Sequence, residues 1–244
     1  TGAFKCSVVF ANSLTGEVLI SSEVSSSDNK YFNIDLISLR ANYEPGSALK
    51  IFTIGSLLDS DHVNEKKSYL VEDEIEIIEG SCNDNYEGLQ GCFKDFLKHE
   101  PFYITVEEII ERSSNVGTIK IVENSNIDDI EEFLKKFGFG SRTGVELSGE
   151  SRGSFTEYNT CKTCLSSLAI GYSINTTQYQ MVKAYSIIAN GGRDIQLSLL
   201  RKSNQSINKK SIITTDLSNR LKKLLIKVVE GENGTGKSLS LIHI

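Results

Sequence analysis

The spacing of apolar residues predicts both helices and strands along this chain of 244 residues. Apolar positions three or four apart are typical of a helix with one buried face. That spacing predicts helices over residues 45–58, 105–112, 116–121, 127–137, 177–189 and 217–229. Alternating apolar and polar positions are typical of strands. That pattern predicts strands over residues 5–10, 17–21, 68–79 and 195–200.

Polar and glycine-rich stretches separate these elements. Residues 12–16 are Asn-Ser-Leu-Thr-Gly, which predicts a turn between the first two strands. Residues 22–33 are mostly polar and residues 80–93 are rich in Gly, Asn and Asp, so we expect both to be surface loops. Thr105-x-x-Glu108 and Thr177-x-x-Gln180 have the spacing of a capping box, which places the starts of two helices at Thr105 and Thr177.

The composition is that of a soluble globular protein. Hydrophobic residues make up 39% and charged residues 24% of the chain, which are ordinary values. The net charge of −6 is spread along the chain without a basic cluster, so nucleic acid is not expected as a partner. The sequence has no apolar run of about 18 residues, as a membrane span requires, no signal-peptide pattern and no initiator methionine. We therefore expect an internal fragment of a longer protein.

The cysteines leave several pairings open. They stand at positions 6, 82, 92, 161 and 164, too few and too irregular for a disulfide scaffold. Cys82 and Cys92 would close a small loop in an oxidising compartment. Cys161-Lys162-Thr163-Cys164 has the spacing of a redox pair or of half a zinc site. The sequence has no second pair with zinc-ligand spacing and its three histidines are scattered, so neither a metal nor a cofactor is expected.

The strongest chemical signal is Glu44-Pro45-Gly46-Ser47-Ala48-Leu49-Lys50-Ile51-Phe52-Thr53. Pro45 and Gly46 suit the start of a helix. Lys50 falls on the face of the following apolar residues, and Ser47 lies one turn earlier. Burial lowers the pKa of a lysine, and a neutral lysine can accept the proton of a serine and make it a nucleophile. Backbone N–H groups at a helix start can stabilise the resulting oxyanion. Ser47 and Lys50 are therefore candidate catalytic residues.

A second pair of candidate residues lies in Ser113-Ser114-Asn115, between two predicted helices. Such a connection is a rigid place from which to present polar side chains to a cleft. Ser27-Asp28-Asn29 and Ser81-Cys82-Asn83 have the same Ser-x-Asn pattern but lack helical flanks. Ser-x-x-Lys also recurs, at Ser27–Lys30 and Ser206–Lys209, inside polar stretches. The flanking sequence therefore favours Ser113 and Asn115 as partners of Ser47 and Lys50.

The end of the chain carries a misleading signal. Residues 231–238, Gly-Glu-Asn-Gly-Thr-Gly-Lys-Ser, match the phosphate-binding P-loop pattern in full. A P-loop connects a strand to a helix, whereas residues 217–229 before it have helical spacing, so nucleotide binding is not expected. Residues 239–244 resemble the translation of a sequencing adaptor, and we interpret them as lying outside the domain.

These motifs resemble those of penicillin-binding proteins, in the same order along the chain. In that family Glu-Pro-Gly-Ser-x-x-Lys carries the nucleophile, and a Thr-Val-Glu-Glu helix runs into Ser-Ser-Asn-Val-Gly, as at residues 105–117 here. Residues 137–140, 143–150, 167–173, 189–192 and 230–237 also match family segments. Ser173 stands where the family usually has glycine, so we expect a slightly different backbone there. The resemblance covers residues 5–237 and is greatest to class B proteins, with the cell-division type favoured.

The resemblance implies an α/β (α+β) serine acyltransferase fold over residues 1–238, like that of penicillin-binding proteins and β-lactamases. Its five-stranded antiparallel sheet would be flanked by helices and would lack its C-terminal strands here. The implied enzyme is a peptidoglycan D,D-transpeptidase, in which Ser47 attacks the carbonyl between two D-alanines and Lys50 accepts its proton. Ser113 would relay a proton to the leaving amine, and Asn115 would bind Lys50 and the substrate amide.

The family's third motif, Lys-Thr-Gly, is expected shortly after Lys237 and is absent from the 244 residues. We therefore expect the fragment by itself to be inactive and poorly soluble. The resemblance also implies peptidoglycan stem peptides as substrates, β-lactams as inhibitors and a glycosyltransferase of the division or elongation machinery as a partner. The implied location is the periplasmic face of the bacterial cytoplasmic membrane, with an anchor upstream.

Two alternatives remain open. The first keeps the fold and changes the outcome, as in a β-lactamase, a D,D-carboxypeptidase or a β-lactam sensor. Efficient hydrolysis of β-lactams needs a base for deacylation. Glu146 and Glu150 lie in the right general stretch but match a structural segment of the family. The second alternative is a truncated module that packs but does not catalyse.

Overall fold

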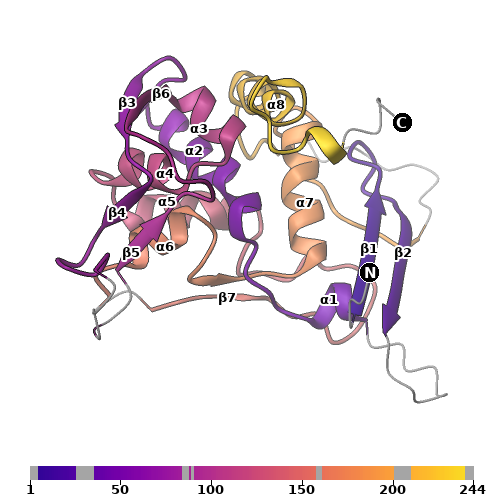
Figure 1. Ribbon diagram of the computed structural model, residues 1–244. Coiled ribbons are helices and arrows are strands. Elements are labelled where there is room, and N and C mark those ends of the chain that lie inside the picture. The colour runs from indigo at the N-terminus through magenta and orange to yellow at the C-terminus, as the bar shows by residue number, and fades with distance from the viewer. Residues whose placement is uncertain are drawn as a thin grey trace. The chain divides into compact units, whose positions relative to one another are not determined.

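The computed structural model describes residues 5–25, 36–83, 88, 91–157, 161–200 and 210–239. The chain divides into two compact units. Unit 1 comprises residues 1–43, 135–155 and 175–218, and unit 2 comprises residues 44–134, 156–174 and 219–244. Figure 1 labels their helices and strands. Within the described ranges, no helix combines the length and the apolar character needed to cross a membrane.

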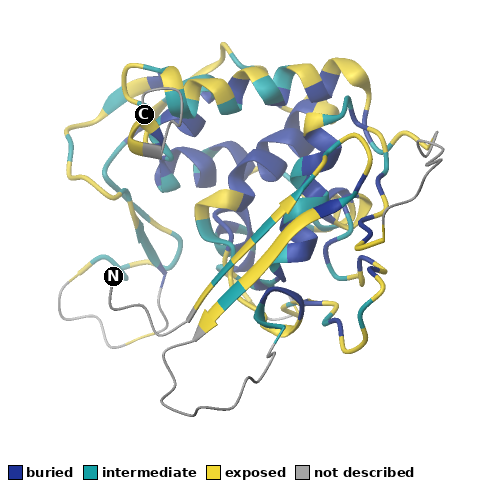
Figure 2. Ribbon diagram, turned by 90° about the vertical axis from the view of Figure 1, so that its right-hand side faces the viewer, coloured by how far each residue is buried: buried dark blue, intermediate teal, exposed yellow. Residues whose placement is uncertain are grey.

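Unit 1 begins with an antiparallel hairpin of β1 (Lys5–Ala11) and β2 (Val18–Ser25), which run side by side in Figure 1. The predicted turn between them forms, and Asn12 Oδ1 accepts two backbone N–H groups there. β2 continues to Ser25 rather than ending at Ser21, because its last residues pair with the start of β1. Backbone pairing needs no apolar side chains, so the polar composition concealed this extension. Both strands carry mostly exposed and intermediate residues (Figure 2).

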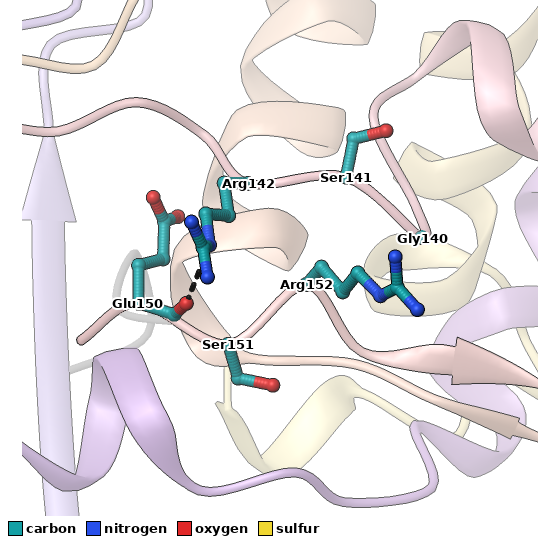
Figure 3. Close-up of a pocket in the computed structure, with 6 residues that line it drawn as sticks. All are labelled: Gly140, Ser141, Arg142, Glu150, Ser151 and Arg152. Carbon is teal, nitrogen blue, oxygen red and sulfur yellow. Dashed lines mark hydrogen bonds between the residues drawn. The ribbon is translucent and has the colours of Figure 1, made fainter.

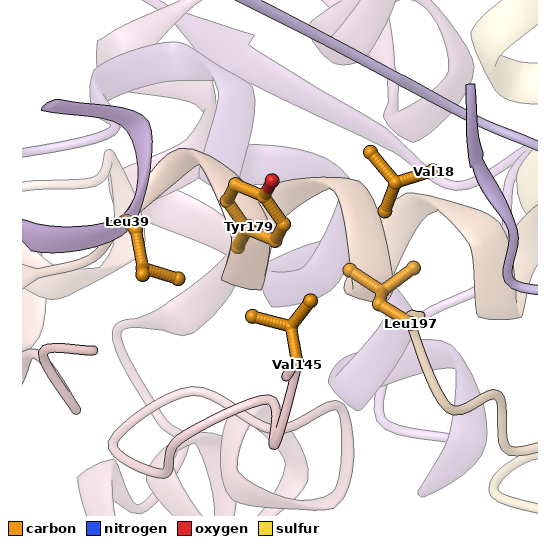
Figure 4. Close-up of a cluster of buried hydrophobic side chains, with 5 residues drawn as sticks. All are labelled: Val18, Leu39, Val145, Tyr179 and Leu197. Carbon is orange, nitrogen blue, oxygen red and sulfur yellow. The ribbon is translucent and has the colours of Figure 1, made fainter. Parts of the chain in front are cut away.

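The core of unit 1 joins segments that lie far apart in the sequence. Helix α7 (Gln178–Ala189) begins at the predicted capping box of Thr177 and Gln180, and it contacts β1 and the short helix α1 (Ile37–Arg40). Buried side chains from five segments meet around it, as Figure 4 shows: Val18, Leu39, Val145, Tyr179 and Leu197. Burial of these side chains stabilises the unit through the hydrophobic effect.

Residues 195–200 do not form the predicted strand. They make a single parallel bridge, between Ser198 and Glu17, with backbone hydrogen bonds to Gly16 and Val18. The alternation arises because Ile195 and Leu197 are buried, although the segment does not pair with a neighbouring strand along its length. Two other strands are only two residues long, namely β7 (Ser154–Phe155) and β8 (Ile174–Asn175).

The predicted helices of unit 2 are present. They are α2 (Lys50–Asp59), preceded by the 3₁₀ turn η1 (Gly46–Leu49), then α3 (Val106–Arg112) and α4 (Asn115–Val122). Helix α6 (Cys164–Ala169) was not predicted, because its six residues are too few to show a helical period. Helices α5 (Ile127–Lys136) and α8 (Thr215–Glu230) have residues in both units, and the turn η2 (Lys237–Leu239) follows α8. Every residue of α2 from Lys50 to Leu58 is buried, so this helix is covered on all sides and not on one stripe.

Two small antiparallel sheets complete unit 2. β3 (Ser68–Val71) pairs with β6 (Phe102–Thr105), and β4 (Glu74–Glu76) pairs with β5 (Cys92–Lys94). The alternation at residues 68–79 predicted β3 and β4 together, whereas β5 and β6 lie outside that stretch and were not predicted. Within the described part of the chain, the strands pair two by two.

Four cysteines form two disulfides, Cys82–Cys92 and Cys161–Cys164, while Cys6 is an exposed free thiol. The sequence left both pairings open. In this oxidised form the paired sulfurs are not available as zinc ligands. Of the misleading motifs, Ser81-Cys82-Asn83 lies in the loop that the first disulfide closes. Residues 27–30 and 206–209 lie outside the described residues.

Candidate active site

Three helices of unit 2 bring the candidate residues together. α2, α3 and α4 contact one another and lie close together in Figure 1. Lys50 is the first residue of α2, Ser113 ends α3, and Asn115 is the first residue of α4. Lys50 and Asn115 are 65 positions apart in sequence, so only the packing of the helices makes them neighbours.

Ser47 lies in the 3₁₀ turn directly before α2 and is exposed. In a 3₁₀ turn, side chains three residues apart are eclipsed, which keeps Ser47 and Lys50 on one side. The turn is fixed from behind by a hydrogen bond from Gly46 N–H to the Gly171 carbonyl, 3.0 Å long. Among the described residues, no hydrogen-bond partner is recorded for the Ser47 hydroxyl. An exposed, unengaged hydroxyl in a fixed turn is suited to attack a substrate.

Lys50 is fully buried, as its place on the apolar face predicted. Its ammonium donates to the Ser113 carbonyl at 2.5 Å, to Asn115 Oδ1 at 2.7 Å and to Ser113 Oγ at 3.3 Å. A lysine ammonium has three donors, and all three find acceptors here. Lys50, Ser113 and Asn115 therefore form one hydrogen-bonded group.

The connection between α3 and α4 has an unusual backbone at Ser113. Its φ is +56°, in the left-handed region that non-glycine residues rarely adopt. This conformation ends α3, and Ser114 then caps α4 by accepting the Gly117 N–H at 2.8 Å. A residue held in a sparsely populated conformation at a candidate site is a common sign of functional constraint. Here the strained residue presents its carbonyl and its hydroxyl to Lys50.

Burial lowers the pKa of the Lys50 ammonium to about 8, and the negative charge of Asp95 opposes this fall. With that pKa, about one molecule in ten carries a neutral Lys50 at neutral pH. A neutral amine keeps two N–H donors, which suit the two shorter contacts, and gains a lone pair that can accept a proton. The geometry and the pKa together give Lys50 the properties of a general base.

Asn115 uses both ends of its side chain. While Oδ1 accepts from Lys50, Nδ2 donates to the Lys94 carbonyl at 2.8 Å. An amide nitrogen carries two N–H groups, so one of them is left for a further acceptor. This orientation of the amide is what a contact to a substrate carbonyl requires.

Asp95 is a residue of this site that the sequence did not reveal. It follows β5 and accepts hydrogen bonds from Ser114 Oγ and from the backbone N–H groups of Asn115 and Val116, at 2.8, 2.6 and 3.0 Å. The residue lies at the edge of a stretch predicted as a surface loop, 20 positions before Asn115. No local pattern announces such a contact.

The other candidate residues have structural roles. The Glu150 carboxylate accepts the N–H groups of Thr143 and Gly144 and the Thr143 hydroxyl. The Glu146 carboxylate accepts the Ser198 hydroxyl and the Leu199 N–H. Both carboxylates thus hold the backbone of unit 1, as the structural interpretation of this segment predicted.

Residues 231–238 do not have the geometry of a P-loop. They follow a helix, α8, and lead into the turn η2, whereas a P-loop follows a strand. The segment is instead tied to α3, because the buried Glu111 carboxylate accepts the Asn233 N–H at 2.7 Å. This geometry agrees with the interpretation that the motif does not bind nucleotide phosphates.

Unit 1 contains a pocket with a volume of about 640 Å³. It is lined by Gly140, Ser141, Arg142, Glu150, Ser151 and Arg152 (Figure 3). Gln180 links the two segments that line this pocket, because its Nε2 donates to the carbonyls of Ser141 and Arg152. The pocket is lined by none of the candidate catalytic residues.

Ser173 departs from the expectation drawn from its sequence. Its φ is +60°, a value that glycine adopts easily and serine rarely does. The left-handed backbone that suits a glycine is therefore present with a serine in its place.

Comparison with known families and curated proteins gives consistent matches. A family model for the penicillin binding protein transpeptidase domain matches residues 6–243. The penicillin-binding protein PbpB of Mycolicibacterium smegmatis is 30% identical over 205 residues, which cover 79% of this chain and 29% of that protein. The stage V sporulation protein D of Bacillus subtilis is 27% identical over 228 residues, which cover 88% and 33%. The chain spans about a third of the length of these relatives.

Solved structures share the fold. Penicillin-binding protein 3 of Mycobacterium tuberculosis, complexed with ampicillin, has a TM-score of 0.82 at 22% identity and covers 98% of this chain, with 56% of its own chain matched. A peptidoglycan glycosyltransferase from Burkholderia ambifaria has a TM-score of 0.79 at 21% identity, covering 97% and 69%. The predicted mixed fold of helices and antiparallel strands is confirmed.

Proposed function

Because the chain belongs to the family of penicillin-binding protein transpeptidase domains, we propose that it carries the serine acyltransferase site of a peptidoglycan D,D-transpeptidase. The substrate class is the D-Ala-D-Ala end of peptidoglycan stem peptides. The observation that supports this proposal most is the buried Lys50, held by Ser113 and Asn115 one turn after an exposed serine.

The proposed reaction begins with neutral Lys50. Ser47 Oγ attacks the carbonyl carbon between the two D-alanines while its proton passes to the lysine lone pair. The C–N bond then breaks, and the departing amine of the terminal D-alanine takes a proton relayed from Lys50 through Ser113 Oγ. The contact between Lys50 Nζ and Ser113 Oγ, at 3.3 Å, gives this relay a path.

The second half of the reaction releases the ester formed on Ser47. The amine of a second stem peptide attacks the ester carbonyl and loses its proton to Lys50. The ester C–O bond then breaks, and Ser47 Oγ takes a proton back from Lys50. Asn115 positions the acyl chain through its remaining N–H. A β-lactam can acylate Ser47 in the same first half, because its amide resembles the peptide bond that Ser47 attacks.

The structural use of Glu146 and Glu150 favours transpeptidation over β-lactam hydrolysis. Both carboxylates are engaged by groups of unit 1, and hydrolysis needs a base that activates water. We place the protein at the periplasmic face of the cytoplasmic membrane. Its proposed partners there are stem peptides and a glycosyltransferase of the division machinery.

Covalent labelling tests this function. The whole protein, treated with a fluorescent penicillin, should be labelled once, and Ser47→Ala should abolish labelling while the protein stays folded. Ser206→Ala is the matched control, since Ser206 has the same Ser-x-x-Lys spacing in a polar stretch. Equal labelling of the Ser47 variant and the wild type would place the nucleophile elsewhere and overturn the proposal.

A further inference from the structure

The carboxylate of Asp95 makes an unusual number of contacts for one side chain. Oδ1 accepts the backbone N–H groups of Asn115 and Val116, and Oδ2 accepts Ser114 Oγ and lies 3.2 Å from His99 Nε2. Its side chain is only 10% exposed. Hydrogen bonds to an ionised acceptor are roughly twice as strong as neutral ones. Asp95 therefore holds the start of α4 from outside the helix.

This arrangement exceeds what helix capping needs. Ser114 already fills the cap position, because its Oγ accepts the Gly117 N–H. Asp95 adds the N–H groups of the next two residues, so that donors along the whole first turn are satisfied. A negative charge at a helix N-terminus is also stabilised by the helix dipole. The extra contacts fix the direction in which Asn115 leaves the connection.

The fixed segment is the one that meets Lys50. Ser113 and Asn115, on either side of Ser114, supply all three acceptors of the Lys50 ammonium. Asp95 thus acts on Lys50 in two ways, through the backbone of this connection and through its charge. We propose that Asp95 is a positioning residue for acylation, holding Ser113 and Asn115 in register with Lys50; this inference rests on the function proposed above.

The charged groups near this cluster include Arg112, which directly precedes Ser113 and whose guanidinium lies over the Phe102 ring at 5.3 Å. His99 faces Asp95 from the same loop and lies edge-on to the ring of Phe102 in β6. Both ring nitrogens of His99 face acceptors, since Nδ1 lies 3.0 Å from the Glu100 carbonyl. The side chain of Lys94 pairs with Glu74 at 2.9 Å, so its charge is balanced locally. Asp95 is the carboxylate that acts on Lys50.

The test compares Asp95→Asn with Glu108→Gln in the whole protein. Each variant removes one carboxylate at the N-terminus of a helix, and Glu108 caps α3 without contacting the Ser113–Asn115 connection. The measurement is the second-order rate constant of acylation by a fluorescent penicillin, as a function of pH. Asp95→Asn should lower its plateau by about 10- to 100-fold, the cost of a small misplacement of catalytic groups. Glu108→Gln should leave the plateau unchanged.

The pH profile separates positioning from mere support of the fold. Without the Asp95 charge, Lys50 loses its proton more easily. The rising limb, which is the pH range over which the acylation rate constant increases, should therefore move to lower pH in Asp95→Asn. Asp95→Glu keeps the charge and should restore the limb but not the full plateau. A purely structural role would lower the rate equally at every pH and leave the limb in place. If the plateau rate constant and the pH of the rising limb in Asp95→Asn both equal those of the wild type, the proposal is overturned.

Two further readouts keep the test independent of catalysis. Amide hydrogen exchange at Asn115 and Val116 should accelerate in Asp95→Asn, and the NMR titration of Lys50 should move to lower pH. If the wild type is not labelled at Ser47, the proposed transpeptidase function fails, yet these readouts still decide the role of Asp95. Unchanged exchange and an unchanged Lys50 titration would contradict that role.

Discussion

Lys50 combines two properties that oppose each other in most proteins. It is fully buried, which disfavours its charge, and its ammonium has three acceptors, which favour it. Burial lowers its pKa to about 8, although the negative charge of Asp95 opposes this fall. A lysine in this state can act as a hydrogen-bond donor when charged and as a base when neutral.

The pH dependence of acylation follows from this pKa. Lys50 must be neutral to accept the proton of Ser47, so the acylation rate constant should rise as pH increases through about 8 and level off above it. Lys50→Arg is the control, because arginine stays charged across this range. That variant should be slow at every pH. A wild-type profile that is flat, or that falls while Lys50 loses its proton, would exclude Lys50 as the base.

At the scale of elements, the backbones of the Ser47 turn and of Gly171 approach each other closely behind the site. Gly171 follows α6 with a φ of +89°, and a Cβ built on it would lie 1.9 Å from the Gly46 carbonyl oxygen. Only glycine fits between these two backbones. The position of Ser47 therefore depends on α6 as well as on α2.

Gly171→Ala should displace the Ser47 turn and lower the acylation rate constant by about 10- to 100-fold, as expected for a misplaced nucleophile. Gly191→Ala is a closely matched control, since Gly191 has the same φ of +89° but open space around its Cβ. It should cost only the strain of a left-handed alanine, about 1 kcal/mol of unfolding free energy. Equal acylation by both variants would show that the contact does not position Ser47.

Sequence predicted those elements whose signals are local. The capping boxes at Thr105 and Thr177 gave the starts of α3 and α7, and the stretch around Ser47 predicted the buried lysine. Contacts between distant segments left no such signal. The pairing of Ser22–Ser25 in β2 and the contacts of Asp95 depend on partners far along the chain. The apolar alternation at residues 195–200 gave a wrong strand prediction. Such alternation indicates which side chains are buried, and residues can be buried without the hydrogen-bonded pairing of a strand.

At the scale of the whole molecule, the chain of 244 residues holds Ser47, Lys50, Ser113 and Asn115 but no Lys-Thr-Gly. In the family, that motif supplies an oxyanion donor and an anion clamp for the substrate. Loss of one oxyanion donor costs about 10² to 10³ in rate. In the family this motif also lies on a strand of the sheet, and a strand edge left unpaired favours aggregation. We therefore predict that residues 1–244 by themselves are poorly soluble and show neither detectable transpeptidation nor stoichiometric acylation by penicillin.

Expression of this chain beside the whole protein checks the prediction, with gel filtration for solubility and mass spectrometry for the acyl adduct. The Ser47→Ala form of the whole protein serves as the unlabelled reference. If the chain is soluble and is acylated as fast as the whole protein, then the third motif is dispensable and the account of the site given above is incomplete.

The left-handed backbone at Ser113 narrows the evolutionary routes open to this site. Branched and bulky side chains are disfavoured in that conformation, and the residues that adopt it readily are Gly, Asn and Asp. Each of these would remove the hydroxyl next to Lys50, and a change of conformation would also turn the Ser113 carbonyl away from Lys50. Under the function proposed above, selection by β-lactams has little room to change position 113. Inhibitors that contact its hydroxyl would then bind at a position where resistance mutations are rare.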